Sequence, residues 1–162
     1  MPGVRIHTLA WAAIFALALV ACGNADDEAD DHAAHEDDPA DYDIDDQPDA
    51  AAVWVSPLDN DVVSSPVEVE MGATDVDIVP AGASAVGEGH LHILVDSGCA
   101  SRGEVIPGPS DEAEADGYIH FGDGETSGEI DLEPGDYELC LQLADGAHRA
   151  FGTTDVIEIR VE

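Results

Sequence analysis

The stretch DYELCLQL, residues 136–143, decides the fold class of this chain. Successive side chains of a β-strand point to opposite faces of a sheet. Leu139 and Leu141 therefore share one face of this segment, whereas Cys140 shares the other face with Glu138 and Gln142. This alternation predicts a half-buried antiparallel strand.

Short runs of the same kind continue on both sides of this strand. VEVEM and VIEIRV alternate in the same way, and turn-forming stretches such as LDND, PGPSD and EPGDY separate the runs. SDEAEADG is the one candidate helix, and it is short and has no apolar face. Seven or eight strands in about 110 residues predict an all-β fold, an immunoglobulin-like β-sandwich of antiparallel strands. The predicted strands are AAVWVS, VEVEMGA, VDIVP, HLHILVD, YIHFG, SGEIDL, DYELCLQL and VIEIRV.

The first 21 residues resemble an export signal more than part of a folded domain. The apolar run TLAWAAIFALALVA follows Arg5 and is too short for a comfortable membrane span. It ends at Leu19-Val20-Ala21-Cys22, which has the form of a bacterial lipobox. We predict a lipoprotein signal peptide at 1–21 and lipidation of Cys22, which anchors the exported chain to the outer face of the cell membrane. An ordinary signal peptide or an N-terminal membrane anchor is the alternative.

The segment that follows consists almost entirely of Asp, Glu and Ala. It cannot bury enough apolar surface to offset the entropy lost on ordering. We therefore predict a disordered acidic tether over residues 22–50 and a folded domain over 51–162. His32 and His35 of the tether could bind divalent cations weakly, although a solvated run of charge is the simpler interpretation.

The charge of the chain excludes some partners. Four arginines and no lysine face 37 acidic residues, which gives a net charge of −33. Such a chain repels nucleic acid and anionic lipid surfaces, so we expect no nucleic-acid partner. Acidity spread over a whole chain is typical of adaptation to salt, which screens self-repulsion. We interpret the host as halophilic or halotolerant, with an acidic protein of an ordinary host as the alternative.

Two cysteines remain once Cys22 is assigned to the lipid. Cys99 and Cys140 form an even pair in an exported, oxidising setting, where a disulfide is expected. A pair of thiolate metal ligands is the alternative. Because Cys140 shares its face with Glu138 and Gln142, we expect the disulfide on a sheet edge or an outer face rather than in the core.

Four histidines fall within the predicted domain. His90 and His92 alternate in GEGHLHILVD and share one face of a strand. His120 ends the strand YIHFG, and His148 lies in the loop DGAHRAF. If they converge at one end of the sandwich, their imidazoles suit zinc or copper.

A metal-binding histidine usually donates its second ring nitrogen to a carboxylate or carbonyl. The alternative to a metal site is a set of histidines that only bond to loop carbonyls. The candidate carboxylates are Asp96, Asp123, Glu125 and Asp145.

Three segments, GHLHILVD, YIHFGDGET and LADGAH, resemble motifs of an exported bacterial family catalogued as domain of unknown function 4399. The resemblance covers roughly residues 55–162. That family shows a G-H-H-H-hydrophobic-Asp strand, an H-I-H-F-G-x-G-x-T turn and an L-x-D-x-x-H segment. Leu91 and Tyr118 replace family histidines, and Gly146 and Phe151 stand where many members have further histidines. The resemblance implies a shared site that keeps four histidines and has dispensable neighbours.

Two functions fit these features. The first is a membrane-tethered, extracytoplasmic, non-catalytic domain that binds copper or zinc through its four histidines. The second is a structural or adhesion module of the cell envelope that holds no metal and meets an unidentified protein partner. We expect no enzyme, with metal-dependent redox activity as a weak alternative, because the sequence has no nucleophile elbow, phosphate loop or dinucleotide fingerprint.

Overall fold

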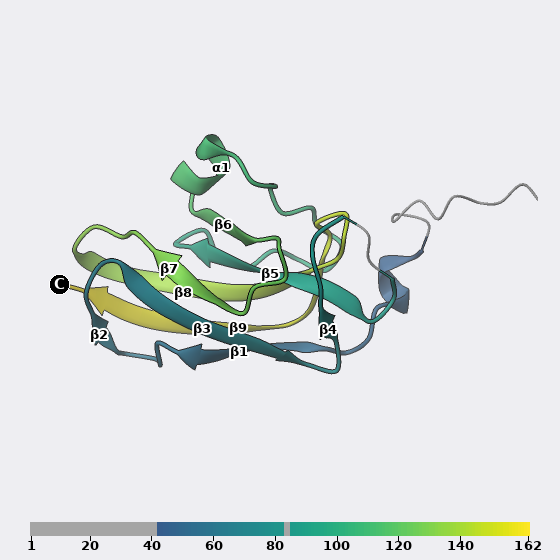
Figure 1. The fold of residues 1–162 in the computed structure, drawn as a ribbon, viewed down its shortest axis with the longest axis horizontal. Helices are drawn as coiled ribbons and strands as arrows, with labels where there is room; N and C mark the ends of the chain where they lie inside the picture. Colours follow the sequence, from purple (N-terminus) through teal and green to yellow (C-terminus); the bar gives the residue numbers. More distant parts are fainter. Residues whose placement is uncertain (1–41, 83–84) are drawn as a thin grey trace, which may run out of the picture. The chain divides into compact units, whose positions relative to one another are not determined.

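The computed structural model describes residues 42–82 and 85–162, and the regular secondary structure of this part of the chain is almost entirely β-strand (Figure 1). The all-β prediction is confirmed, and each predicted strand is present. The strands are β1 (Ala51–Ser56), β2 (Val62–Val63), β3 (Val67–Thr74), β4 (Asp77–Ile78), β5 (Glu88–Val95), β6 (Tyr118–Phe121), β7 (Ser127–Ile130), β8 (Gly135–Ala144) and β9 (Ala150–Val161). A 3-10 turn, η1 (Ile44–Asp46), and a short helix, α1 (Asp111–Ala115), complete these ranges. No helix in them is long and apolar enough to cross a membrane.

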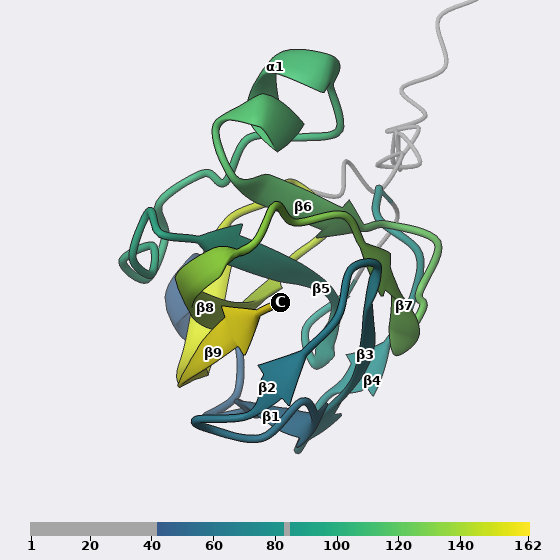
Figure 2. The ribbon, with the colours of Figure 1, turned by 90° about the vertical axis from the view of Figure 1, so that its left-hand side faces the viewer.

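The strands form one hydrogen-bonded path in the order β4-β5-β8-β9-β1-β3-β7, with β2 on β9 and β6 on β5. Figure 2 shows this path curling around the core. Two layers thus face each other, as expected of a sandwich, but β1 joins them where Ala51 pairs with Thr153 of β9. The sheet is mixed rather than antiparallel throughout, since β1 and β2 run parallel to β9, and β4 runs parallel to β5.

Strand β8 has two buried faces. Its leucines 139, 141 and 143 are fully buried in the main core, together with Leu91 and Ile93 of β5. On the opposite face Cys140 and Ala144 belong to a smaller buried cluster. The alternating pattern therefore predicted the strand and its two faces correctly. The prediction that only one face is buried is wrong, because the second face is covered as well.

The second face is covered by the loop between β5 and β6, residues 96–117, which we call the covering loop. It carries α1, which lies on the side of the sheet away from β1 in both views (Figures 1 and 2). Ile106 of this loop is buried in the smaller cluster, and the backbone N–H of Ala100 donates to Oε1 of Gln142, 3.0 Å away. The loop therefore provides both apolar cover and a partner for a buried amide.

The disulfide between Cys99 and Cys140 fastens the covering loop to β8, with the two Cα atoms 5.7 Å apart. It lies on the outer face of the sheet as expected, but Cys140 is fully buried there. The bond joins two cysteines that are 41 residues apart in sequence. Closing this loop stabilises the folded state by about 4 kcal/mol in the chain-entropy model.

Ordered packing begins before Ala51, the predicted start of the domain. Residues 42–50, which we call the N-terminal strap, pack against the sheet, and Gln47 is only 4% exposed. The Arg102 guanidinium donates to the carbonyls of Ile44 and Gln47 at 2.8 and 2.9 Å. These partners are far apart in sequence, which is why local composition placed the strap in the tether. The predicted signal peptide, Cys22 and the tether up to residue 41 lie outside the described residues.

Candidate metal centre

Strands β5 and β6 position three of the four histidines. The strands pair antiparallel with His92 directly opposite His120, and His90 lies two residues before His92 on the same face. Leu91 and Ile93 point the other way, into the main core. His90, His92 and His120 therefore lie on the outer face of β5 and β6, near the end of β8, where Ala144 pairs with His90.

The fourth histidine, His148, comes from the turn between β8 and β9. Its backbone has a left-handed φ of 62°. Its N–H donates to the Asp145 carbonyl at 2.9 Å, and its own carbonyl accepts from the Ile106 N–H at 2.9 Å. These bonds tie His148 both to the end of β8 and to the covering loop.

The structure brings the four histidines together into one cluster, which we call the histidine cluster. The six distances between ring centroids run from 4.8 to 5.5 Å. Nε2 of His90 lies 2.9 Å from Nε2 of His92, and Nε2 of His148 lies 3.0 Å from Nε2 of His120. One nitrogen from each ring lies within 4.8 Å of the others, so the four rings together could hold a metal ion.

Burial keeps the imidazoles neutral. His90 and His92 are fully buried, and this burial, reinforced by the neighbouring imidazoles, lowers the pKa of His90 to about 3 and that of His92 to about 2. His120 and His148 are half-buried, and burial also lowers the pKa of each. At neutral pH the rings carry the free lone pair that a metal ion needs.

The hydrogen bonding of the two buried histidines, His90 and His92, is incomplete. A neutral imidazole has one N–H and one lone pair, so in each close Nε2 pair one ring donates and the other accepts. The buried Nδ1 atoms of His90 and His92 have no partner. Leaving a buried polar atom unpaired costs about 1–3 kcal/mol, and an ion bound at the Nε2 atoms would not remove this cost.

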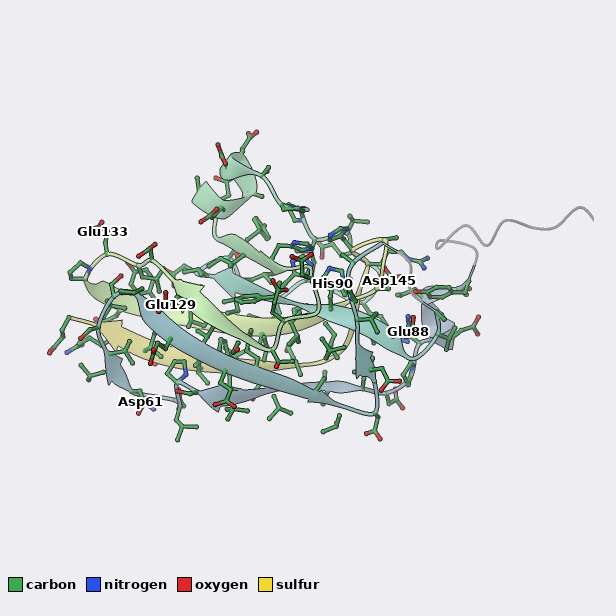
Figure 3. All side chains as sticks on the ribbon, in the orientation of Figure 1. Asp61, Glu88, His90, Glu129, Glu133 and Asp145 are labelled. Atoms are coloured by element: carbon green, nitrogen blue, oxygen red, sulfur yellow. A yellow bond between two sulfur atoms is a disulfide. The ribbon has the colours of Figure 1, made fainter. Side chains whose placement is uncertain are left out.

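Asp145 is the one predicted carboxylate buried beside the cluster (Figure 3). Its oxygens accept from the backbone N–H of Ala147 and of Arg149, from Arg149 Nε at 2.7 Å and from the Tyr42 hydroxyl. None of the described bonds joins it to an imidazole, but its charge raises the pKa of His90 and His148 against the effect of burial. It therefore acts on the cluster through its field and by fixing the turn.

The other predicted carboxylates have different positions. The charges of Asp123 and Glu125 raise the pKa of His120 against the effect of burial, and Glu125 also accepts from the Asp123 N–H. Asp96 lies four residues beyond His92, about 13 Å along an extended chain. Its Oδ1 accepts from the Glu138 N–H at 2.8 Å, so the prediction that it orients an imidazole is corrected.

The sequence interpretation missed Tyr42 and Arg149. The Arg149 guanidinium pairs with Asp145, lies 5.0 Å above the Tyr42 ring and donates to the Tyr42 carbonyl. An arginine directly after a candidate ligand, in a chain with four cations, was the available signal. Its partner in the N-terminal strap was not visible in any local pattern.

Replacing Arg149 with alanine should destabilise the domain by about 3–5 kcal/mol, because it leaves the buried Asp145 without its cation. Urea unfolding measures the loss. The matched control is Arg160→Ala, which breaks an exposed pair with Asp136 and should change stability very little. Equal effects of the two substitutions would contradict this role of Arg149.

Gly122 makes room for the ring of His120. A Cβ at this position would lie 2.5 Å from Nδ1 and 2.6 Å from Nε2 of His120. Gly122→Ala should therefore displace the ring and weaken metal binding about 10–100-fold, a typical effect of disturbing a ligand's support. Titration with Zn²⁺ measures the change. Gly72→Ala is the control because no atom lies within 4 Å of its added Cβ, and equal affinities of the two variants would refute the prediction.

Comparison with known proteins adds one match. The family described as "Domain of unknown function (DUF4399)" matches residues 69–162, a range that contains all four histidines of the cluster. No curated protein and no solved structure matches the chain.

Proposed function

Since the chain belongs to the DUF4399 family, whose description assigns no activity, we propose a function from the site itself: the domain binds one copper or zinc ion through the histidine cluster. One observation carries the proposal. Four neutral imidazoles from β5, β6 and the β8–β9 turn face one another within the reach of a single ion. Their donor type suits zinc, copper, iron and nickel better than hard cations such as magnesium or calcium.

The number of ligands favours binding over catalysis. Structural zinc sites use four protein ligands, whereas catalytic sites use three and keep one position for water or substrate. The histidine cluster offers four. We therefore propose that the domain stores, senses or is stabilised by its ion and is not an enzyme.

The surface beside the cluster supports access for a cation. A groove of about 330 Å³ is lined by His120 together with Glu114, Glu125 and Glu129. Acidic walls raise the local concentration of cations. An ion could thus approach the half-buried side of the cluster without opening the main core.

The decisive experiment is metal analysis of the untagged full chain after reconstitution with Zn²⁺ or Cu²⁺ and gel filtration. We expect one equivalent of tightly held ion. A His32→Ala/His35→Ala variant controls for weak binding outside the folded domain and should keep that equivalent. A metal content far below one equivalent would refute the proposal and leave the envelope module without metal as the function.

We further propose that the domain is exported, which the lipobox and the disulfide both support, and that it is held at the membrane through Cys22, which the lipobox supports. The full chain should partition into the detergent phase when it is expressed in a bacterial host. Cys22→Ser should move it to the aqueous phase, because the acyl chains are lost. Unchanged partitioning of the variant would refute the lipid anchor.

A further inference from the structure

The arrangement of the four rings distinguishes between coordination geometries. Four imidazoles bound tetrahedrally at about 2.0–2.1 Å have ring centroids about 5.2 Å apart in all six pairs. A square plane of the same bonds puts two of the six pairs about 6.4 Å apart. The six observed distances all fall between 4.8 and 5.5 Å, so the rings form a nearly regular tetrahedron.

The backbone holds this arrangement in place. His90, His92 and His120 stand on paired strands in fixed register. His148 is bonded on both sides of its peptide, to Asp145 and to Ile106 of the covering loop. In a square plane, at least one pair among the rings of His90, His92 and His120 would have to move apart by more than about 1 Å. Close-packed side chains around these strands oppose such a movement.

The ligand atoms near the cluster do not favour a soft ion such as Cu(I). Cys99 and Cys140 are tied in a disulfide, and Met71 lies in the main core on the other face of the sheet. Thiolate and thioether ligands, which select Cu(I), are therefore absent from the described surroundings of the cluster.

On these grounds we propose that the histidine cluster is a tetrahedral site for Zn²⁺. Its donor nitrogens, two pairs of which lie 2.9 and 3.0 Å apart and all of which lie within 4.8 Å of one another, adjust when the ion binds. The inference rests on the proposed function and adds the identity of the ion and its geometry. Zn²⁺ has no geometric preference from its d electrons and accepts a tetrahedron without strain. Cu²⁺ prefers a tetragonal arrangement, so this frame reduces the advantage that Cu²⁺ has at most nitrogen sites.

Replacement of zinc by Co²⁺ in the full chain tests the geometry, because tetrahedral Co²⁺ absorbs visible light far more strongly than octahedral Co²⁺. We expect an intense blue spectrum that saturates at one equivalent and disappears when Zn²⁺ is added. His148→Ala replaces one imidazole by water and should shift and weaken the intense bands. Ions held by surface carboxylates are octahedral and nearly colourless, so they do not imitate this result.

The possible outcomes are separable. Bound Co²⁺ with a weak, octahedral spectrum, or bound Cu²⁺ with the wide parallel hyperfine splitting of a tetragonal complex, would overturn the tetrahedral zinc site but leave metal binding intact. Absence of any bound ion would overturn both. Cu²⁺ with a reduced hyperfine splitting, as a distorted tetrahedron gives, would support the inference.

Discussion

Added Zn²⁺ should raise the melting temperature of the domain strongly, and His92→Ala should greatly reduce this effect. An ion at 1,000 times its dissociation constant stabilises the folded state by about 4 kcal/mol. For a domain of this size that corresponds to roughly 15 °C. His92 is fully buried on a paired strand, so its loss leaves three ligands that no neighbouring side chain can complete. Thermal unfolding at increasing Zn²⁺ concentrations measures the difference.

Two comparisons make this result specific. The His32→Ala/His35→Ala variant should keep the full temperature shift, since these residues precede the folded domain in sequence. Metal-free His92→Ala should melt cooperatively, which shows that the variant folds. If folded His92→Ala retains the shift of the unaltered protein, the histidine cluster is not the site that Zn²⁺ stabilises.

Acidification from pH 7 to pH 5 should destabilise the metal-free domain by about 4 kcal/mol. In the unfolded chain the two buried histidines have an ordinary pKa near 6.5 and take up protons below it. In the folded domain burial holds the pKa of His90 at about 3 and that of His92 at about 2, so neither ring is protonated at pH 5. The unfolded state then binds more protons, and each ring contributes about 2 kcal/mol to the loss.

The sign of this dependence is opposite to that of a histidine stabilised by an acidic partner. Stability is fully present above pH 6.5 and is lost as the pH falls toward the folded-state pKa values. Urea unfolding in the presence of a chelator measures it at several pH values. His92→Gln is uncharged throughout and should lose the share of this one ring, about 2 kcal/mol. A stability that is flat between pH 7 and pH 5, or a slope unchanged in His92→Gln, would contradict the neutral buried cluster.

Local patterns in the sequence carried much of this structure. The alternation in DYELCLQL and VIEIRV predicted β8 and β9 because side chains on a strand change face at every residue. The spacing of His90 and His92 predicted one shared face for the same reason, and the even cysteine pair predicted the disulfide. The strands and the shared face of the histidines depend on residues that are close together in the chain. The disulfide prediction depends on an oxidising compartment outside the cytoplasm.

Other features depended on contacts between distant segments. His92 and His120 become neighbours because β6 pairs with β5 after the covering loop. No periodic pattern in the sequence shows which residues of the two strands will pair across a loop of this length. The N-terminal strap is ordered by Arg102 and Arg149, which lie 55 or more residues away from their carbonyl partners. Composition assigned the strap to the tether because its own residues are polar and acidic.

By itself, the sequence determined an all-β domain, a disulfide and a set of four histidines, since alternation, cysteine parity and residue type are properties of the chain alone. Only the tertiary structure decided that both faces of β8 are buried and that the four histidines meet in one cluster. It also decided that their rings stand at the corners of a tetrahedron. That arrangement follows from strand register and from the backbone bonds of His148, which form only when segments far apart in sequence pack together.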